Sequence, residues 1–223
     1  MFTKLVSGLA ALSSVAQALP NPTAPSSLEA RTQVSSNVWC GPVLAASAKQ
    51  ASAEWVVPQV SMPSSSNGDD IEFYQWVGID GYHAGSCPNA LLQVGTAERY
   101  INNDWVYTVW LEYYTPDNTS SWHFNDPAVK AGDSSASWPL QATGDYPLCY
   151  EHVEWVNEAP TKNLPTFPAM TFTSLSYTDW NGNTYNAAGS DLQYLNQQYA
   201  VCSSTLSSDG STAYFTEAPP SSS

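Results

Sequence analysis

The sequence predicts an all-β protein, an antiparallel β-sandwich, and three observations support this prediction. No stretch between the two ends of the chain repeats apolar residues every 3.6 positions over three turns, as a helix would require. Several segments instead alternate apolar and polar residues, and turn-forming pairs such as Asn181-Gly182 separate them. Aromatic residues make up 13% of the chain, and side chains of this kind favour strands.

Residues 105–114 show the clearest alternation. The odd positions are all apolar or aromatic, whereas the even positions include the aromatic and polar side chains Thr108, Trp110, Glu112 and Tyr114. Successive side chains of a strand point to opposite faces of its sheet. One face of this strand therefore suits a core, and the other suits a cleft lined by aromatic rings around a carboxylate.

Other segments are also predicted to be strands. The alanine-rich stretch 43–53 continues into residues 54–58, which are typical of a strand. Further candidates are residues 71–79, 90–94, 152–157, 169–177 and 198–202. No internal repeat and no second domain boundary is visible.

The two ends of the chain differ from this central region. Residues 1–18 are predicted to be a signal peptide, because Lys4 precedes a short apolar run that ends in Ala16-Gln17-Ala18. Residues 19–36 are expected to form a short propeptide or flexible leader, with Arg31 as a candidate processing point. A single domain should span residues 37–216, followed by a disordered tail, 217–223. We expect a secreted, extracellular protein with no membrane span after signal removal.

The charge balance excludes some partners. Lys and Arg total 6 against 20 Asp and Glu, for a net charge of −14, so a nucleic acid is not expected as a partner. In acid the carboxylates become neutral, and few positive charges remain to repel one another. The composition therefore fits a protein adapted to acidic surroundings, and we expect it to be a monomer.

Four cysteines in a secreted chain predict two disulfides, with three connectivities open. None of the cysteines lies in a Cys-x-x-Cys pair, which argues against a zinc site. Asn118 begins the sequon Asn-Thr-Ser and is a predicted glycosylation site on a surface loop.

Several catalytic arrangements are absent from the sequence. It contains no Gly-x-Ser-x-Gly, no His-Glu-x-x-His and no glycine-rich phosphate loop. The three histidines are His83, His123 and His152, and nothing pairs any of them with a nucleophile. We therefore expect no metal and no cofactor.

Carboxylates and one glutamine remain as candidates. Glu154 and Glu158 are four residues apart in a predicted strand, so both lie on one face, and Glu158 ends the strand before Pro160. Gln93 is enclosed by apolar neighbours and must find hydrogen-bond partners. Gly95, two residues further on, permits close backbone approach. Taken one at a time, each of these features is also consistent with a purely structural role.

Several motifs in order resemble one family. The blocks are Ser36-Asn37-Val38-Trp39-Cys40-Gly41, Trp76-Val77-Gly78-Ile79-Asp80-Gly81, Leu91-Leu92-Gln93-Val94-Gly95, Trp110-Leu111-Glu112-Tyr113-Tyr114 and Glu154-Trp155-Val156-Asn157-Glu158-Ala159-Pro160. This order and spacing resembles the glutamic peptidases, or eqolisins. The resemblance covers roughly residues 37–215.

The resemblance implies a sandwich of two large antiparallel sheets, of the concanavalin-like or jelly-roll type, around an acidic cleft. The catalytic residues of the family match Gln93 and Glu158, and its substrate-binding positions match Trp76, Asp80, Trp110, Glu112 and Tyr114. The family disulfide matches Cys87–Cys149, which leaves Cys40 and Cys202 as a second pair by elimination. The expected substrates are proteins and peptides.

This pair suits peptide hydrolysis at acidic pH. An unperturbed Glu has a pKa of about 4.3, so Glu158 could take a proton from water and return it to the leaving nitrogen. The Gln93 amide could hold the water and donate to the oxyanion. Asp80 and Glu112 could tune the pKa of Glu158 and orient Gln93.

The sequence also departs from the family pattern. Only 16 positions separate Asp133 from Cys149, where the family usually has an additional hairpin, so either the sandwich has lost strands or the sequence lacks a segment here. Ala97 and Thr108 occupy positions that are commonly acidic in the cleft, and Ala159-Pro160 replaces further acidic residues.

Two other functions stay open at this point. One is a non-catalytic module that binds peptide or carbohydrate through its aromatic residues, as an inactive homologue would. The other is a two-carboxylate glycosidase, for which Glu112 and Glu158 would have to lie about 5–9 Å apart across a cleft.

Overall fold

The computed structural model describes residues 32–66, 70–83, 85–87, 89–114, 122–126, 129–134, 140–141 and 148–220, with backbone alone for 122–126 and 140–141. Within these ranges the regular elements are strands: β1 Gln33–Ser36, β2 Trp39–Ala45, β3 Gln50–Trp55, β4 Glu72–Asp80, β5 Leu91–Ile101, β6 Asp104–Tyr114, β7 Trp122–Asp126, β8 Leu140–Gln141, β9 His152–Glu158, β10 Met170–Thr178, β11 Thr184–Tyr185, β12 Asp191–Asn196, β13 Val201–Leu206 and β14 Ala213–Ala218.

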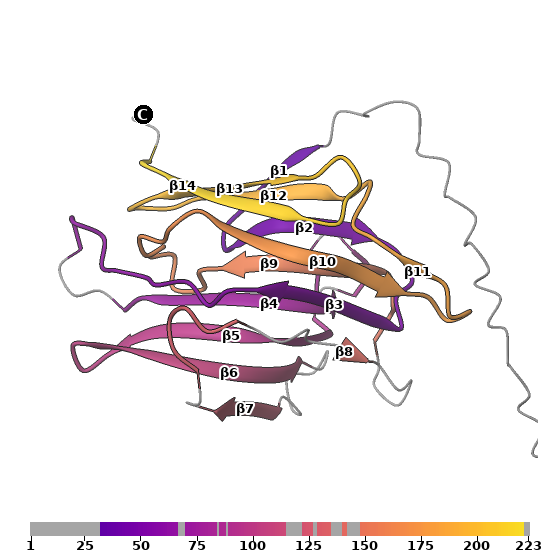
Figure 1. The fold of residues 1–223 in the computed structure, drawn as a ribbon, viewed down its shortest axis with the longest axis horizontal. Coiled ribbons are helices and arrows are strands. Elements are labelled where there is room, and N and C mark those ends of the chain that lie inside the picture. Colours follow the sequence, from indigo (N-terminus) through magenta and orange to yellow (C-terminus); the bar gives the residue numbers. More distant parts are fainter. Residues whose placement is uncertain are drawn as a thin grey trace, which may run out of the picture.

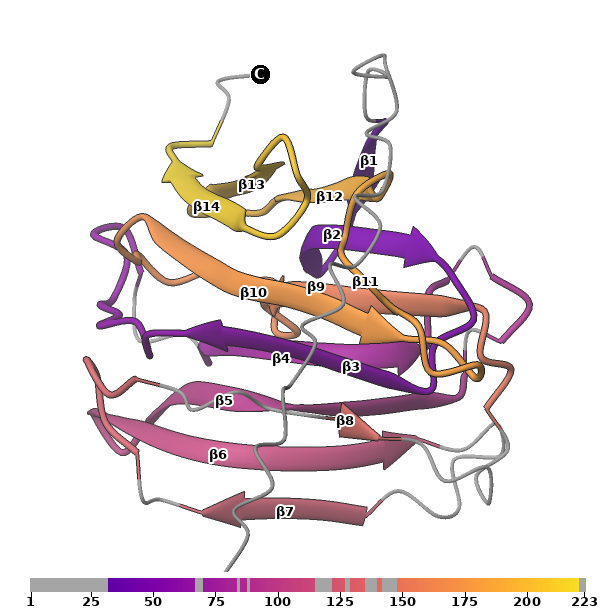
Figure 2. The same ribbon diagram turned by 45° about the vertical axis from the view of Figure 1, so that its right-hand side comes forward.

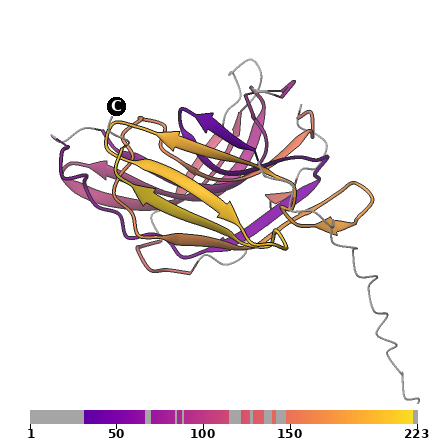
Figure 3. The same cartoon turned by 90° about the horizontal axis from the view of Figure 1, so that it is seen from above.

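Backbone hydrogen bonds join the strands in the order β7-β6-β5-β4-β9-β2-β12-β13-β14-β10-β3-β8. Neighbours along this path are antiparallel, whereas β1 pairs in parallel with β12. The sheet curls over so that β10 and β3 lie in front of β9 and β4 (Figures 1 and 2), and Figure 3 shows the two layers from above. The predicted all-β, antiparallel fold is confirmed, although continuous hydrogen bonding joins the two expected sheets into one path.

The main core lies between the two layers. Large aromatic rings of the neighbouring strands β3, β10 and β14 stack along one layer of it, with 4.7 Å between the rings of Trp55 and Phe172 and 4.8 Å between those of Phe172 and Phe215. The indole N–H of Trp155 donates to the Ser52 carbonyl of the opposite layer at 2.9 Å. Burying one such apolar side chain stabilises the fold by about 1.5–3 kcal/mol.

A smaller apolar cluster covers the other face of the same strands, and we call this the site face. It consists of Trp39, Val43, Trp76, Leu91, Ala97, Trp110 and Val156. Side chains of β4 and β9 alternate between the two clusters, because Val77 and Trp155 join the main core while Trp76 and Val156 join the smaller one. Strands β2, β9, β4, β5 and β6 therefore carry buried apolar residues on both faces.

The predicted strands match the observed strands unevenly. Residues 105–114 correspond to β6, residues 71–79 to β4 and residues 152–157 to β9. The alanine-rich stretch is divided between β2 and β3, and β12 was not predicted. Strand β1 lies inside the segment expected to be a flexible leader, because Gln33–Ser36 bonds to the edge of β12.

Both disulfides form as expected. Cys40 bonds to Cys202 and Cys87 to Cys149, with Cα–Cα distances of 6.0 and 5.9 Å. No helix long and apolar enough to cross a bilayer occurs in the described ranges. The predicted signal peptide, Asn118 and most of the interval between Asp133 and Cys149 lie outside the described residues.

Candidate active site

Five neighbouring strands bring the candidate residues onto the site face. Directly opposed residues of paired strands share a face, so the register shows which side chains are neighbours. Glu158 of β9 is opposite Trp39 of β2 on one side and opposite Tyr74 of β4 on the other. Gln93 of β5 is opposite Glu112 of β6. Residues far apart in sequence therefore meet on one surface.

Glu158 ends β9 and is held by two indoles. The Trp76 Nε1–H donates to Glu158 Oε2 at 2.8 Å, and the Trp39 side chain also donates to this carboxylate. The two rings pack edge to face, with 5.0 Å between centroids and 78° between planes. Trp39 was not among the site residues predicted from sequence, although the motif Ser36-Asn37-Val38-Trp39-Cys40-Gly41 was part of the family resemblance. Its partner Glu158 lies 119 positions away, so no local pattern indicates the contact.

The environment of Glu158 favours its neutral form. The residue keeps some solvent exposure, but protein atoms crowd its carboxylate, and this desolvation raises its pKa to about 7. The two indole donors lower the pKa, whereas the negative charges of Glu112 and Glu72 raise it further. Desolvation outweighs the two donors, so Glu158 differs from the ionised base expected from sequence.

Gln93 is buried and has only part of its hydrogen-bonding capacity in use. Its Nε2 donates to Glu112 Oε2 at 3.0 Å, and its Oε1 has no partner among the described residues. Gly95 lies two positions along β5, where an added Cβ would be 1.8 Å from the Gln75 carbonyl oxygen. The expected close backbone approach at Gly95 is therefore present, and it helps to keep β5 tight against β4.

Glu112 connects Gln93 with Tyr114. The Tyr114 hydroxyl also donates to the Glu112 carboxylate, so one carboxylate accepts from both residues. Tyr114 is 38% exposed, whereas Gln93 is 3% exposed. Burial and the charges of Glu112 and Glu158 raise the pKa of the Tyr114 hydroxyl, so it stays protonated in acid. This side of the site offers an exposed ring beside a hydrogen-bonded carboxylate.

Trp76 and Trp110 form the floor of the site. Trp76 is fully buried and Trp110 is 2% exposed, and Gly95 lies between them in register. The Trp110 Nε1–H donates to the Thr96 carbonyl at 3.2 Å, and its ring packs 5.2 Å from that of Tyr74. The aromatic rings predicted to bind substrate thus support the site from below, and Tyr114 is the more accessible ring.

The row that contains Glu158 lacks the acidic groups common in the family. From Glu158 the row runs through Tyr74 and Ala97 to Thr108, and Ala97 and Thr108 are 2% and 4% exposed. The Tyr74 hydroxyl donates to Glu72 Oε2 at 3.0 Å, and burial raises its pKa. The charges near Glu158 therefore come from Glu72 and Glu112 instead.

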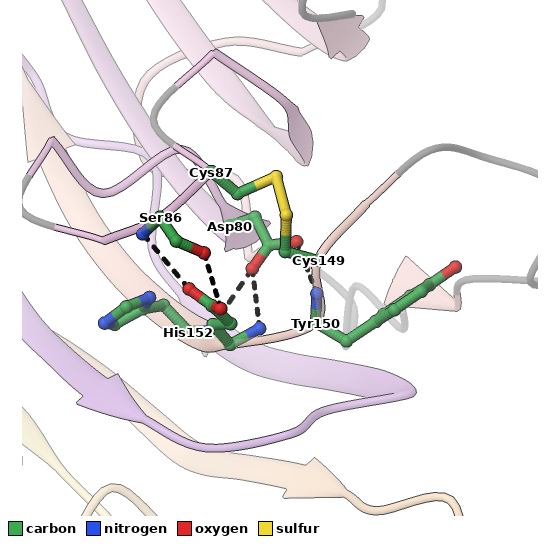
Figure 4. The surroundings of a disulfide bond; sticks show 7 residues. Asp80, Ser86, Cys87, Cys149, Tyr150 and His152 are labelled. Carbon is green, nitrogen blue, oxygen red and sulfur yellow. Dashed lines mark hydrogen bonds between the residues drawn. A yellow bond between two sulfur atoms is a disulfide. The ribbon is translucent and has the colours of Figure 1, made fainter.

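The prediction that Asp80 binds substrate is not supported by the structure. Asp80 is 1% exposed, and its carboxylate accepts the backbone N–H groups of Tyr150 at 2.7 Å, Glu151 at 2.8 Å and His152 at 3.3 Å. Figure 4 shows these bonds beside the Cys87–Cys149 disulfide. Asp80 has a φ of 67° at the end of β4, which turns its carboxylate toward the segment that leads into β9. In this structure its carboxylate is used to hold the backbone of residues 150–152.

Glu154 is a second buried carboxyl group on this face. It is fully buried, and neither of its oxygens has a hydrogen-bond partner in the described part of the chain. Burial raises its pKa well above the ordinary value, and the charge of Asp80 raises it further. Glu154 is therefore neutral in the folded protein at acidic pH. Among the described residues, no three His, Cys, Asp or Glu side chains gather as they would around a metal ion.

Comparison with known proteins gives one family. A sequence model of the Peptidase A4 family matches residues 37–136 and 134–214. No match was found among curated proteins.

Solved structures show the same fold. The chain is similar to scytalido-glutamic peptidase, solved with a peptide-based transition-state analogue, at 21% identity and a TM-score of 0.62, and the match covers 81% of this chain and 98% of that chain. It is also similar to SCP-B, a member of the eqolisin family solved with the tripeptide Ala-Ile-His, at 21% identity, the same coverage and a TM-score of 0.50. The family match, which spans most of the predicted domain, shows that this chain belongs to the Peptidase A4 family, the eqolisins, and is a glutamic-type peptidase.

Proposed function

We propose that this protein is a secreted acid endopeptidase in which Glu158 and Gln93 direct water at a peptide bond. The observation that carries the proposal is the Glu158 carboxyl group, which is crowded by protein, bonded to two indoles and given a pKa of about 7. Gln93 lies on the same face with an unpartnered Oε1. A carboxyl group with a perturbed pKa on the same face as a free amide acceptor is an arrangement suited to acid–base catalysis.

The raised pKa determines which form of Glu158 begins the reaction. Below about pH 7 the carboxyl group is mainly protonated, so it can donate its proton to the carbonyl oxygen of the scissile bond. At the same time its other oxygen can take a proton from the attacking water. The product is a neutral gem-diol, and Glu158 remains a neutral carboxylic acid.

The second half of the reaction uses the same carboxyl group. Glu158 donates its proton to the leaving nitrogen as the C–N bond breaks, and it takes a proton back from a gem-diol hydroxyl. The products are a carboxylic acid and an amine, and the enzyme returns to its starting form. This scheme places no net charge on a carboxyl group whose surroundings disfavour the ionised form.

Gln93 is suited to hold the water. Its Oε1 is an unused acceptor, and one N–H of its amide is already bonded to Glu112. The second N–H remains available to the carbonyl oxygen of the substrate. Glu112 would thereby fix the orientation of the amide, and one such donor at a developing oxyanion contributes on the order of 3 kcal/mol.

Peptide binding is supported by the exposed part of the site. Tyr114 offers a ring that is 38% exposed next to Glu112, on the edge of the face that carries Glu158. The two solved relatives described above were bound to a peptide-based analogue and to a tripeptide. We propose unfolded proteins and peptides as the substrates.

Secretion is supported by the predicted signal peptide and by the two disulfides, which persist in oxidising compartments. Activity in acid is supported by the small number of Lys and Arg residues in the sequence. It is also supported by the burial of the Glu98 and Glu154 carboxyl groups. The predicted glycosylation of Asn118 would be consistent with the same route.

The proposal is tested by digesting a denatured protein at pH 3–4 with the wild type and two variants. Glu158→Gln and Gln93→Ala should each remove activity while the circular dichroism of the fold is retained. Gln75→Met, on the core face of the same sheet, is the matched control and should remain active. Activity that survives both site substitutions would refute the assignment.

A further inference from the structure

Gln197 connects the two segments that carry Trp39 and Glu158. It follows β12, and its side chain is 8% exposed. Its Nε2 donates to the Asn37 carbonyl at 2.8 Å and to the Ala159 carbonyl at 3.0 Å. Asn37 lies two residues before Trp39, and Ala159 directly follows Glu158. Both hydrogens of the amide therefore have an acceptor.

The surrounding bonds make this junction rigid. Trp39 is paired directly with Glu158, and the Ala159 N–H donates to the Val38 carbonyl at 3.0 Å. The Gln197 backbone N–H donates to the Ala200 carbonyl at 3.0 Å, which fixes the turn that presents the side chain. The Cys40–Cys202 disulfide joins β2 to β13 beside this turn. Gln197 thus extends from a fixed turn to the segment before Trp39 and the segment after Glu158.

We propose that Gln197 is a positioning residue that holds Trp39 against the Glu158 carboxylate. It acts through the two carbonyls and touches neither Glu158 nor the reacting atoms. A primary amide supplies two N–H donors without a charge, whereas Lys or Arg would place a charge in a buried region. Gln197 Oε1 has no partner among the described residues, so the donors are the part of the amide that the fold uses.

The charged neighbours of Glu158 define the expected effect. Glu72 and Glu112 raise its pKa, and Trp39 and Trp76 lower it by donating hydrogen bonds. The hydroxyls of Tyr74 and Tyr114 lie near enough to sense its charge, and Arg99 lies beside Tyr74. Among these groups around Glu158, Trp39 is the one that comes from β2, and it is a neutral hydrogen-bond donor. Loss of the Trp39 donor should therefore raise the pKa of Glu158 further.

The inference is tested with Gln197→Leu and with Gln197→Glu. The matched control is Gln193→Leu, because Gln193 is a fully buried amide on β12 whose Oε1 is also unpartnered and whose Nε2 makes only a 3.4 Å bond to the Tyr82 hydroxyl. Two readouts are needed: kcat and KM on an uncharged peptide, and the pKa of Glu158 from carbon-detected NMR titration. The Glu158 resonance is assigned by its absence in Glu158→Gln.

Gln197→Leu should lower kcat about tenfold or more with little change in KM, because a small displacement of the Trp39 contact misaligns Glu158. The pKa of Glu158 should rise by about half a unit or more. Gln197→Glu should retain part of the activity below about pH 4, where its neutral carboxyl group still donates one bond, and lose it as that group ionises. Gln193→Leu should leave kcat within about threefold of the wild type and the pKa of Glu158 unchanged.

A folded Gln197→Leu variant with the kcat and the Glu158 pKa of the control would overturn the inference. If this variant does not fold, Gln197→Glu decides the question, since wild-type activity at both pH 3 and pH 5 would overturn it as well. The inference depends on the proposed role of Glu158, but the two can fail separately. A wild type without Glu158-dependent activity would refute the proposed function, whereas the NMR titration would still show whether Gln197 controls the Trp39 contact.

Discussion

Two glutamine–glutamate pairs lie on opposite faces of the same sheet. On the site face, Gln93 Nε2 donates to Glu112 Oε2 at 3.0 Å; on the core face, Gln75 Nε2 donates to Glu98 Oε2 at 2.8 Å. The two glutamines lie on the neighbouring strands β5 and β4. The bond is nearly the same in both pairs, but the surroundings differ.

The core pair is closed off by the second layer. Thr96 donates to Gln75 Oε1 at 2.8 Å and itself accepts from the Trp55 indole of β3 at 3.0 Å. Glu98 is fully buried, and burial raises its pKa well above the ordinary value. Both the Nε2 and the Oε1 atoms of Gln75 are therefore hydrogen-bonded within the fold, and the amide is not available to a substrate.

The pair on the site face has an unused hydrogen-bond acceptor. Gln93 Oε1 has no partner within the described ranges, and Glu112 is partly exposed. The comparison shows that a buried amide–carboxyl bond does not by itself identify a catalytic group. What distinguishes the two pairs is the layer that covers one face and leaves Tyr114 exposed on the other.

The largest expected effect comes from removing the proposed proton donor on the site face. Glu158→Gln should lower kcat/KM by about 10³-fold or more, because the variant can neither give nor take the protons of the reaction. Glu98→Gln is the counterpart on the core face and should retain activity. Steady-state kinetics on a peptide at pH 4 distinguish them, and equal losses in both variants would contradict the comparison.

The two glutamines should differ in which property they affect. Gln93→Met should lower kcat by about 10²-fold, as the loss of a water-holding and oxyanion-binding group does. Gln75→Met should instead lower the free energy of unfolding by about 1–3 kcal/mol, since it leaves Glu98 and Thr96 without their partner. Steady-state kinetics and urea unfolding of both variants check that one variant loses mainly activity and the other mainly stability. A kinetic defect in Gln75→Met as large as that in Gln93→Met would contradict it.

Buried carboxyl groups should make stability depend on pH. Burial raises the pKa of Glu98 and of Glu154 in the folded state above the value in the unfolded chain. Their contribution is fully present below about pH 4 and is lost as pH rises toward the folded pKa, by about 1.4 kcal/mol per pH unit for each group. Glu98→Gln should therefore weaken the decline in thermal stability between pH 5 and pH 7. A wild type whose melting temperature does not fall over this range would contradict the account.

The smallest expected effect concerns the rim of the site. Tyr114→Phe removes the hydroxyl that donates to Glu112 but keeps the exposed ring. It should change kcat/KM by about two- to tenfold, the range expected for one hydrogen bond. Tyr214→Phe, an exposed tyrosine on β14 of the other layer, provides the control and should match the wild type. A Tyr114→Phe variant equal to this control would show that the hydroxyl has no role.

Local patterns were sufficient for several parts of the molecule. Alternation predicted β6, and the resemblance to the family implied the Cys87–Cys149 disulfide and the site residues Gln93, Glu112 and Glu158, with Cys40–Cys202 left by elimination. The prediction of β6 is confirmed because successive side chains of a strand point to opposite faces, so the alternation is visible in the sequence itself.

Other features depend on contacts that no local pattern contains. Asp80 was expected in the cleft, but its left-handed backbone turns it toward the amides of residues 150–152. The contact of Trp39 with Glu158 requires the pairing of β2 with β9. The pKa of Glu158 reflects desolvation by the assembled sheet, so the ordinary value assumed from sequence was wrong for the folded protein.

The central claim is that neutral Glu158 starts the reaction, and the pH dependence of kcat/KM tests it most directly. Initial rates on an uncharged peptide should be measured from pH 2 to pH 8, and circular dichroism in each buffer should confirm that the enzyme is folded. The same series should be run on the Glu98→Gln variant, which is expected to stay folded to higher pH. We expect a plateau in acid and a fall as pH rises through about 7, where Glu158 loses its proton. A rate that instead rises from pH 3 toward pH 7 in the folded enzyme would mean that the ionised carboxylate is the active form, and it would contradict the account.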